Sequence, residues 1–156
     1  MVSEVLSFLH LPDGIIVDAT VGTAGHSAEI LRRISPKGFV IGLDVDAEAL
    51  QIAESILSEI SSRFLLFHES YQNIALCLRK AGFFYADGIL FDLGLSSFQL
   101  GIAERGFSFQ NSGPLDMRFD RSKGKTALKF LRECSVAELE RVLRIYGEEK
   151  FSAPLA

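Results

Sequence analysis

The strongest constraint on the fold is a repeated alternation of short apolar runs with segments of helical spacing. Residues 14–19 are a β-branched apolar run and residues 39–44 are a second apolar run, which favours buried strands. Residues 64–67 and 86–92 are predicted as the third and fourth strands, with Phe91 expected in the sheet interior. Because a helical segment separates successive runs, the sequence predicts an α/β fold in which right-handed crossovers join parallel strands.

Helical spacing and end signals place the helices between these strands. Asp46 and Ser135 stand where they can cap the free N–H groups of two helices. The Leu-Pro-Asp-Gly string at residues 11–14 predicts a turn, and the polar, Gly-rich stretch that follows the fourth strand as far as residue 124 predicts a long loop. We predict helices over residues 3–9, 27–34, 47–58, 73–81, 126–132 and 136–145.

Composition and charge exclude several classes of protein. The 156 residues are 48% hydrophobic, which is enough for a packed domain. A net charge of -4 argues against strong non-specific RNA binding by the chain as a whole. A local basic patch is nevertheless present, formed by Arg118, Arg121, Lys123 and Lys125.

Neither a membrane nor a metal ion is expected to bind this chain. No run approaches the roughly 18 apolar residues of a membrane span, and residues 1–8 lack the basic residue of a secretory signal. The three His and two Cys residues show no metal-ligand spacing. We therefore expect a cytoplasmic protein, with an organellar location left open.

The loop after the first strand is the first candidate binding site, because ligands of open parallel sheets bind at the carboxyl ends of the strands. Gly22 and Gly25 allow a tight turn and a close approach of a ligand to the backbone. The loop has neither the six-position Gly-x-Gly-x-x-Gly pattern nor the Gly-Lys-Ser/Thr of a phosphate loop. A dinucleotide-dependent oxidoreductase is thus disfavoured, while an ordinary structural turn stays open.

Polar and aromatic side chains follow the other three strands. Asp44 lies 22 residues after Gly22, where a carboxylate can accept hydrogen bonds from ribose hydroxyls. Its alternative role as a helix cap is better filled by Asp46. Tyr71 can stack on an adenine or pack as an ordinary side chain. Asp92 places a second strand-end carboxylate beside Gly- and Ser-containing turns.

Five sequence motifs occur in order along the chain. They are Asp18-x-Thr20-x-Gly22-x-x-Gly25-His26-Ser27, Asp92-Leu93-Gly94-Leu95-Ser96-Ser97-x-Gln99-Leu100, Glu104-Arg105-Gly106-Phe107-Ser108-Phe109, Gly113-Pro114-Leu115-Asp116-Met117-Arg118-x-Asp120 and Tyr146-Gly147-Glu148-Glu149. On these motifs the chain resembles, from near residue 4 to about residue 151, the ribosomal RNA small-subunit cytosine-N4 methyltransferases. The same motifs argue against a small-molecule methyltransferase on the same fold.

The resemblance implies S-adenosylmethionine as cofactor and a Rossmann-like, three-layer methyltransferase fold. The family holds this cofactor with the first loop, with the acid after the second strand, with an aromatic residue beside the adenine and with two further positions. In this chain those positions are Ala24, Gly25, His26, Asp44, Tyr71, Asp92 and Gln99. The resemblance further implies a cofactor-binding core over residues 1–100.

Residues 101–156 are then expected to form a substrate-side loop and the start of an inserted helical domain. Asp116, Met117 and Arg118 fall on the segment that borders the substrate. The implied reaction is methyl transfer to the exocyclic N4 amine of a cytidine in small-subunit ribosomal RNA, which is the expected partner.

That amine is a weak nucleophile, because its lone pair is delocalised into the ring. Catalysis then requires positioning and a hydrogen-bond acceptor for the amine, and the cytosine has to be unstacked to reach the site. We assign catalytic roles to Asp92, Ser96 and Ser97.

Among the chain's departures from the family pattern, two bear most on its function. Ala24 replaces the first Gly of the usual Gly-Gly-His, which costs stability if that position has a positive φ. Family members also continue well beyond residue 156, so we expect an incomplete form, whether a fragment, a truncated product or an incomplete gene model. A sheet of about four strands would expose an edge and favour self-association. The alternative function is an inactive relative that only binds the cofactor or a partner.

Overall fold

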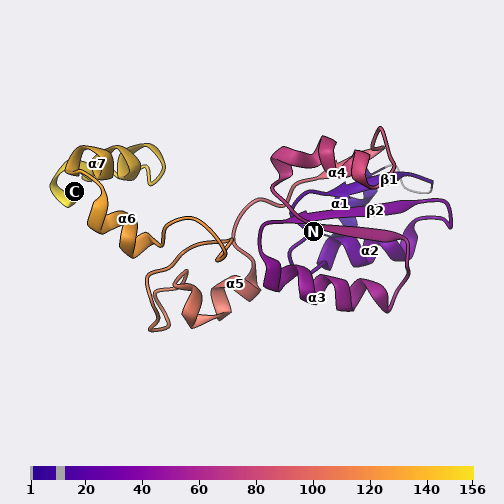
Figure 1. Cartoon of the computed structure of the whole chain (residues 1–156), viewed down its shortest axis with the longest axis horizontal. Helices are drawn as coiled ribbons and strands as arrows, with labels where there is room; N and C mark the ends of the chain where they lie inside the picture. The colour runs from indigo at the N-terminus through magenta and orange to yellow at the C-terminus, as the bar shows by residue number, and fades with distance from the viewer. Residues whose placement is uncertain (1, 10–12) are drawn as a thin grey trace. The chain divides into compact units, whose positions relative to one another are not determined.

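A computed structural model describes residues 2–9 and 13–156 of the chain. It divides into two compact units, Met1–Phe98 and Gln99–Ala156, and Figure 1 shows the elements of each. The first unit carries the sheet and the second carries short helices joined by long loops.

Four parallel strands form one sheet, as the sequence predicts. They are β1 (Ile15–Asp18), β2 (Phe39–Asp44), β3 (Phe64–His68) and β4 (Gly88–Leu90), arranged in the order β3-β2-β1-β4 (Figure 1). Val17 of β1 lies opposite Ile41 on one side and Ile89 on the other. Because the order reverses at β1, the switch point where such sheets bind ligands lies at the carboxyl ends of β1 and β4. The predicted α/β fold class is therefore confirmed.

The fourth strand is shorter than the predicted residues 86–92. Before it, the Asp87 carboxylate accepts from the backbone N–H of Ile15 at 2.7 Å. After it, the backbone N–H of Asp92 donates to the Thr20 hydroxyl at 2.7 Å. Side chains thus bind the backbone on both sides of β4, and the ladder with β1 is limited to three residues.

Helices cover both faces of the sheet, which explains why the strands are apolar throughout rather than alternating. In the first unit these are α1 (Val2–Phe8), α2 (Gly25–Arg33), α3 (Ala47–Ser58) and α4 (Ile74–Lys80). One core cluster joins Ile16 and Val40 to α1, α2 and α3. A second joins Val17 and Ile41 to Cys77 of α4.

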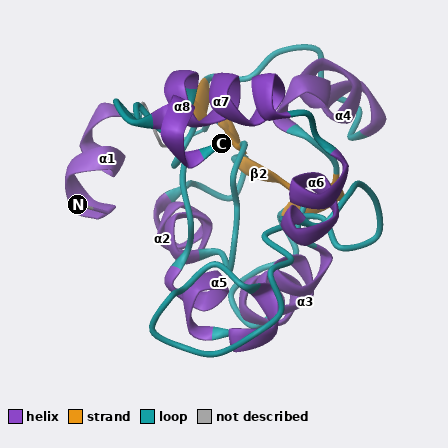
Figure 2. Ribbon diagram, turned by 90° about the vertical axis from the view of Figure 1, so that its left-hand side faces the viewer, coloured by secondary structure: helices purple, strands orange, loops and turns teal. Residues whose placement is uncertain are grey.

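The second unit has almost no apolar core. Its elements are α5 (Ser97–Gly101, shared with the first unit), η2 (Ala103–Arg105), α6 (Ala127–Glu133), α7 (Val136–Ile145) and α8 (Ser152–Leu155) (Figure 2). Among residues 99–156, all of which the structure describes, the buried residues are polar: Gln99, Arg105, Asp116 and Ser152. This unit therefore depends on hydrogen bonds and ion pairs more than the first one does.

Two helix predictions are accurate at both ends, and in both the capping residue is identified from the sequence. The helices predicted over residues 47–58 and 136–145 have these bounds in the structure, with Asp46 accepting from Glu48 N and Ala49 N and Ser135 accepting from Glu138 N. The other predicted helices differ by one or two residues at their ends. The predicted uninterrupted loop to residue 124 is wrong, since α5 and η2 lie within it. The predicted turn at residues 11–14 lies partly outside the described residues.

The β4 edge of the sheet exposes apolar side chains, and Ile89 is 46% exposed. Self-association through this edge stays a prediction. None of the helices that the structure describes is long and apolar enough to cross a membrane.

Ala24 has a left-handed backbone conformation, with φ 67° and ψ 24°. It immediately precedes α2, and its methyl group is fully buried in the core beside α2 and α3. For an L-residue this conformation costs roughly 1–2 kcal/mol. The expected penalty at this position is therefore present, partly offset by the burial of the methyl group.

We predict that Ala24→Gly leaves the free energy of unfolding within about 1 kcal/mol of its original value. Relief of the left-handed strain offsets the loss of about 0.8 kcal/mol of methyl burial and the added freedom of the unfolded chain. The matched control is Ala28→Gly in α2, which removes another buried methyl and should cost about 2 kcal/mol because glycine also weakens a helix. Hydrogen exchange of the β2 amides measures both. Equal losses in the two variants would contradict strain at Ala24.

Candidate functional site

The loop between β1 and α2 is tied to both neighbouring strands. Ala19 N donates to Leu90 O of β4 at 2.9 Å, and Val21 N donates to Leu43 O of β2 at 3.0 Å. Parallel strands end at the same edge of the sheet, so these bonds hold the loop between the ends of β2 and β4. The candidate residues of the first unit gather at this edge.

A buried carboxylate at the end of β1 fixes the loop from beneath. Asp18 is 1% exposed and accepts from the Ser27 hydroxyl at 2.7 Å and from Thr20 N at 3.3 Å. Burial raises the pKa of Asp18, and the hydrogen bonds from Ser27 and Thr20 oppose that increase. Asp18 thus links the start of the loop to the first turn of α2. Asp18 is not among the site residues predicted from the sequence, although a polar residue at the end of a buried strand is a signal that could have identified it.

Asp44, predicted to bind ribose, lies half-buried at the end of β2. Its Oδ2 accepts from Gly22 N at 2.8 Å and its Oδ1 accepts from Asp46 N at 2.9 Å. A carboxylate offers about four acceptor positions. These two backbone bonds use two of them and fix the side chain, which leaves two for the hydroxyls of a vicinal diol.

Asp92 and His26 meet at the carboxyl end of β4. His26 Nδ1 lies 3.6 Å from Asp92 Oδ2, and the Asp92 side chain is 60% exposed while that of His26 is 17% exposed. The Nε2 of His26 is buried and has no hydrogen-bond partner among the described residues. The structure therefore brings together an exposed carboxylate that can accept a proton and an imidazole with one unsatisfied nitrogen.

Two aromatic rings lie near the same edge. Tyr71 starts the short helix η1 (Tyr71–Asn73), and its ring meets that of Phe91 edge-to-face at 5.8 Å. Both side chains are nearly half exposed, so the expected interior position of Phe91 is wrong. Its exposure follows from the early end of β4. The pair presents an aromatic surface on which a purine can pack.

The remaining predicted cofactor-binding and catalytic residues lie in or beside the helices α2 and α5. Gly25 and Ser97 are the exposed first residues of α2 and α5, and Ser96 is half-buried. Gln99 belongs to the second unit, where it is 5% exposed.

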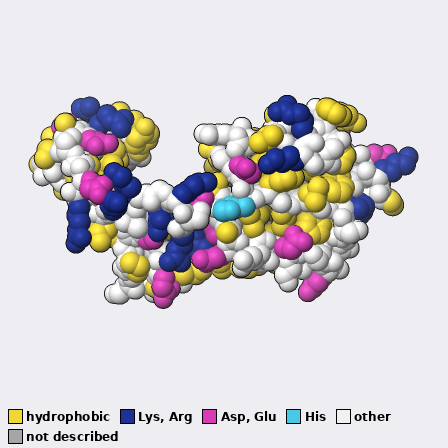
Figure 3. Space-filling view, in the orientation of Figure 1, with side chains coloured by type: hydrophobic (Ala, Val, Ile, Leu, Met, Phe, Trp, Pro, Cys, Tyr) yellow, Lys and Arg dark blue, Asp and Glu magenta, His cyan; other side chains and the backbone are white. Residues whose placement is uncertain are grey.

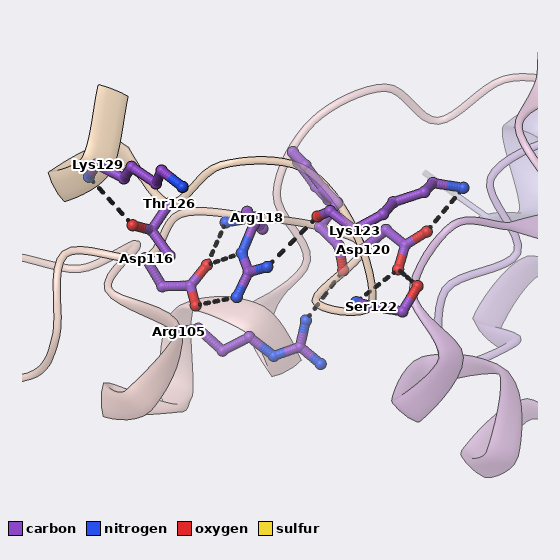
Figure 4. A network of polar contacts seen from close by, with 9 residues as sticks. Arg105, Asp116, Arg118, Asp120, Ser122, Lys123, Thr126 and Lys129 are labelled. Atoms are coloured by element: carbon purple, nitrogen blue, oxygen red, sulfur yellow. Dashed lines mark hydrogen bonds and ion pairs between the residues drawn. The ribbon is translucent and has the colours of Figure 1, made fainter. Parts of the chain in front are cut away.

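The second unit holds Asp116 and Arg118 in a network of polar contacts (Figure 4). Arg118 Nε donates to Asp116 Oδ1 at 2.8 Å, and Nη2 donates to Oδ2 at 2.9 Å. This bidentate hydrogen bonding lowers the pKa of Asp116. The backbone of Asp116 accepts from Ala127 N at 2.7 Å, and Met117 N donates to Arg105 O at 2.9 Å. The network therefore braces the loop between η2 and α6.

The edge of the first unit suits a nucleoside-like ligand. It offers a fixed carboxylate for hydroxyls, aromatic rings for a base and a Gly-containing loop that a ligand can approach closely. Within residues 2–9 and 13–156, no group of three or more His, Cys, Asp or Glu side chains is placed to hold a metal ion.

Comparison with known proteins identifies a family over the whole chain. The model of the MraW methylase family matches residues 1–156. A protein named ribosomal RNA small subunit methyltransferase H from Mycoplasma mycoides is 41% identical over all of this chain and 51% of its own length. One of the same name from Nitrosomonas eutropha is 48% identical over 92% of this chain and 44% of its own length.

The chain thus spans about half the length of the curated relatives it matches. Among solved structures, an rRNA methylase from Streptococcus thermophilus aligns with 49% of this chain and 45% of its own length. Its identity is 27% and its TM-score is 0.41.

We predict that Ser27→Ala destabilises the first unit in a pH-dependent way. Because its pKa is raised above the ordinary 3.8, Asp18 holds its proton more tightly in the native chain than in the unfolded one. Between the pKa of Asp18 in the unfolded chain and its higher pKa in the native chain, the free energy of unfolding falls as the pH rises. The hydroxyl of Ser27 stabilises the ionised form, so its loss should cost about 2 kcal/mol at about pH 8, where Asp18 is more ionised than at pH 4, and about 1 kcal/mol near pH 4.

Hydrogen exchange of the β1 amides at the two pH values measures this difference. Ser70→Ala is the control, since the Ser70 hydroxyl accepts only from the exposed backbone N–H of Gln72 among the bonds described for it. Its cost should be the same at both pH values. A pH-independent cost for Ser27→Ala would contradict the proposed partnership with an ionised Asp18.

Proposed function

Since this chain belongs to the MraW methylase family, we propose that it takes part in S-adenosylmethionine-dependent methyl transfer to the N4 amine of a cytidine in small-subunit ribosomal RNA. The observation that carries the proposal is the convergence of Asp44, Asp92 and the Gly22–Gly25 loop at one sheet edge. The names of the curated relatives support the substrate class, and the cytoplasm is the compartment we propose for this chain.

The residues at this edge fit the cofactor on their chemistry. Asp44 has two acceptor positions left for the ribose hydroxyls, and Tyr71 and Phe91 offer an aromatic surface for the adenine. The unsatisfied Nε2 of His26 and the loop at Ala24 and Gly25 are suited to the polar methionyl end. When bound, the cofactor supplies an electrophilic methyl group on its sulfonium sulfur.

The protein's task is to make the cytosine amine a better nucleophile. A carboxylate can accept a hydrogen bond from the amine and hold that hydrogen out of the plane of the ring. The nitrogen lone pair is then less conjugated with the ring and is localised on nitrogen. Asp92 is suited to this, because its side chain is 60% exposed and its backbone is held by the Thr20 hydroxyl. After methyl transfer the same carboxylate takes the proton that the amine loses, and the His26 imidazole lies beside it, with Nδ1 3.6 Å from Asp92 Oδ2.

Ser96 and Ser97 complete the proposed catalytic segment, and Gln99 is proposed as a further cofactor-binding residue. Asp116, Met117 and Arg118 are proposed on the substrate side. Because the Arg118 guanidinium is already bound to Asp116, its proposed role is to shape the loop rather than to bind substrate directly.

The test is methyl transfer to unmodified small-subunit ribosomal RNA, with the product nucleosides identified by mass spectrometry. We expect N4-methylcytidine, and we expect Asp92→Asn to lower its rate of formation about 100-fold, since a neutral amide cannot take the proton. Glu54→Gln, an exposed residue of α3, is the control and should leave the rate unchanged. Methylation at carbon 5, or an Asp92→Asn variant as fast as the unaltered chain, would disprove the proposed chemistry.

A further inference from the structure

Charge is distributed unevenly along the chain. The first unit carries twelve Asp and Glu against six Lys and Arg, whereas the second carries eight against ten. Within the second unit, residues 118–132 contain six Lys and Arg and a single carboxylate, Asp120. Figure 3 shows Lys and Arg side chains gathered over the part of the molecule that follows α5. We call residues 118–132 the basic segment.

The cations of the basic segment lie at the surface. The side chains of Lys123, Lys125 and Lys129 are 76%, 59% and 59% exposed. Lys125 and Lys129 both pair with Glu133, at 2.7 Å and 3.8 Å. Exposed pairs of this kind are worth at most about 1 kcal/mol, so a phosphate can replace Glu133 as their partner. Two cations sharing one carboxylate also leave a net positive charge there.

The residues that immediately precede the basic segment in the sequence line a hollow of about 300 Å³. Its lining residues lie between Gly106 and Met117. Phe107, Phe109 and Met117 give it apolar walls, and Ser108 and Asn111 add polar groups. The Phe107 ring packs against Phe119 at 5.3 Å, whereas Phe109 is completely exposed. A fully exposed phenyl ring at the rim of a hollow is a platform on which a base can stack.

The backbone of the hollow is strained at one position. Met117 has φ 60°, which is uncommon for a residue with an unbranched apolar side chain. The bond from its N–H to Arg105 O holds it in place, as does the flanking Asp116–Arg118 pair. Strain of this kind persists where the surroundings enforce it, and it is concentrated at binding sites.

We propose that the hollow and the basic segment together form a binding surface for single-stranded RNA. One unstacked base lies against Phe109 in the hollow, and Lys125, Lys129 and their neighbours bind the phosphates that follow. The inference rests on the proposed function for the choice of RNA. A single strand fits better than a duplex, because a paired base cannot enter the hollow without unstacking.

The test is the affinity of the chain for a fluorescent 12-nucleotide single-stranded RNA, measured by anisotropy over a range of salt concentrations. Lys125→Ala/Lys129→Ala should weaken binding roughly 25-fold at about 0.1 M salt and reduce the salt slope by about 1.4, because each phosphate contact on a single strand contributes about 0.7. Phe109→Ala should weaken binding at least about fivefold without changing the slope. The same RNA annealed to its complement should bind more weakly than the single strand.

Lys37→Ala/Lys80→Ala is the matched control, since it removes two exposed lysines from the first unit. Undetectable RNA binding by the unaltered chain, or equal losses in the control and in the basic-segment variant, would overturn the proposal. So would a Phe109→Ala variant with unchanged affinity, which indicates charge attraction alone, or tighter binding of the duplex.

Calorimetric titration of every variant with S-adenosylmethionine separates this proposal from the function it rests on. Retained cofactor binding with lost RNA binding supports the surface. If the variants bind the cofactor, and substitution of Lys125, Lys129 and Phe109 leaves RNA affinity unchanged, the proposed surface alone is overturned. A chain that binds RNA as expected but not the cofactor overturns the proposed function alone.

Discussion

The buried Asp18 carboxylate is the interaction on which the rest of the site depends. It accepts from Thr20 N at the start of the loop and from the Ser27 hydroxyl in the first turn of α2, so it sets the path of the chain between them. That path brings Gly22 N to Asp44 and the Thr20 hydroxyl to Asp92 N. Three strand ends are thereby connected through one short loop, at the place where the strand order reverses. The hydrogen bonds from Ser27 and Thr20 oppose the energetic cost of burying Asp18, and the same bonds help to position Asp44 and Asp92.

The second unit also holds a long loop in place, but it does so with different interactions. It has no buried apolar cluster, and its long loop is held by charged side chains that are bonded to each other and to the backbone. Arg118 is therefore a structural residue first, which leaves the exposed lysines after it as the cations most able to meet a phosphate. Both units thus use fixed polar groups to shape a loop and leave neighbouring groups open to a ligand.

Much of the first unit follows from local sequence, because β-branched runs and capping residues act over a few positions. The strands and the helix capped by Asp46 are of this kind, and so is the position of Asp44 at a strand end. The role of Asp18 depends on Ser27, and the exposure of Phe91 depends on where β4 leaves β1, so neither can be read from one segment. The short helices α5 and η2 lack the periodicity that marks longer ones.

The most direct test of the central claim is a calorimetric titration of the chain with S-adenosylmethionine, compared between the unaltered chain and Asp44→Ala. If the sheet edge holds the cofactor through its ribose, the unaltered chain binds and Asp44→Ala loses about 100-fold or more in affinity, since two hydrogen bonds to a charged group are lost. Glu54→Ala, which removes the same charge from the exposed face of α3, should bind as the unaltered chain does. Equal affinities for all three chains, or no binding by a folded unaltered chain, would contradict this assignment of the site.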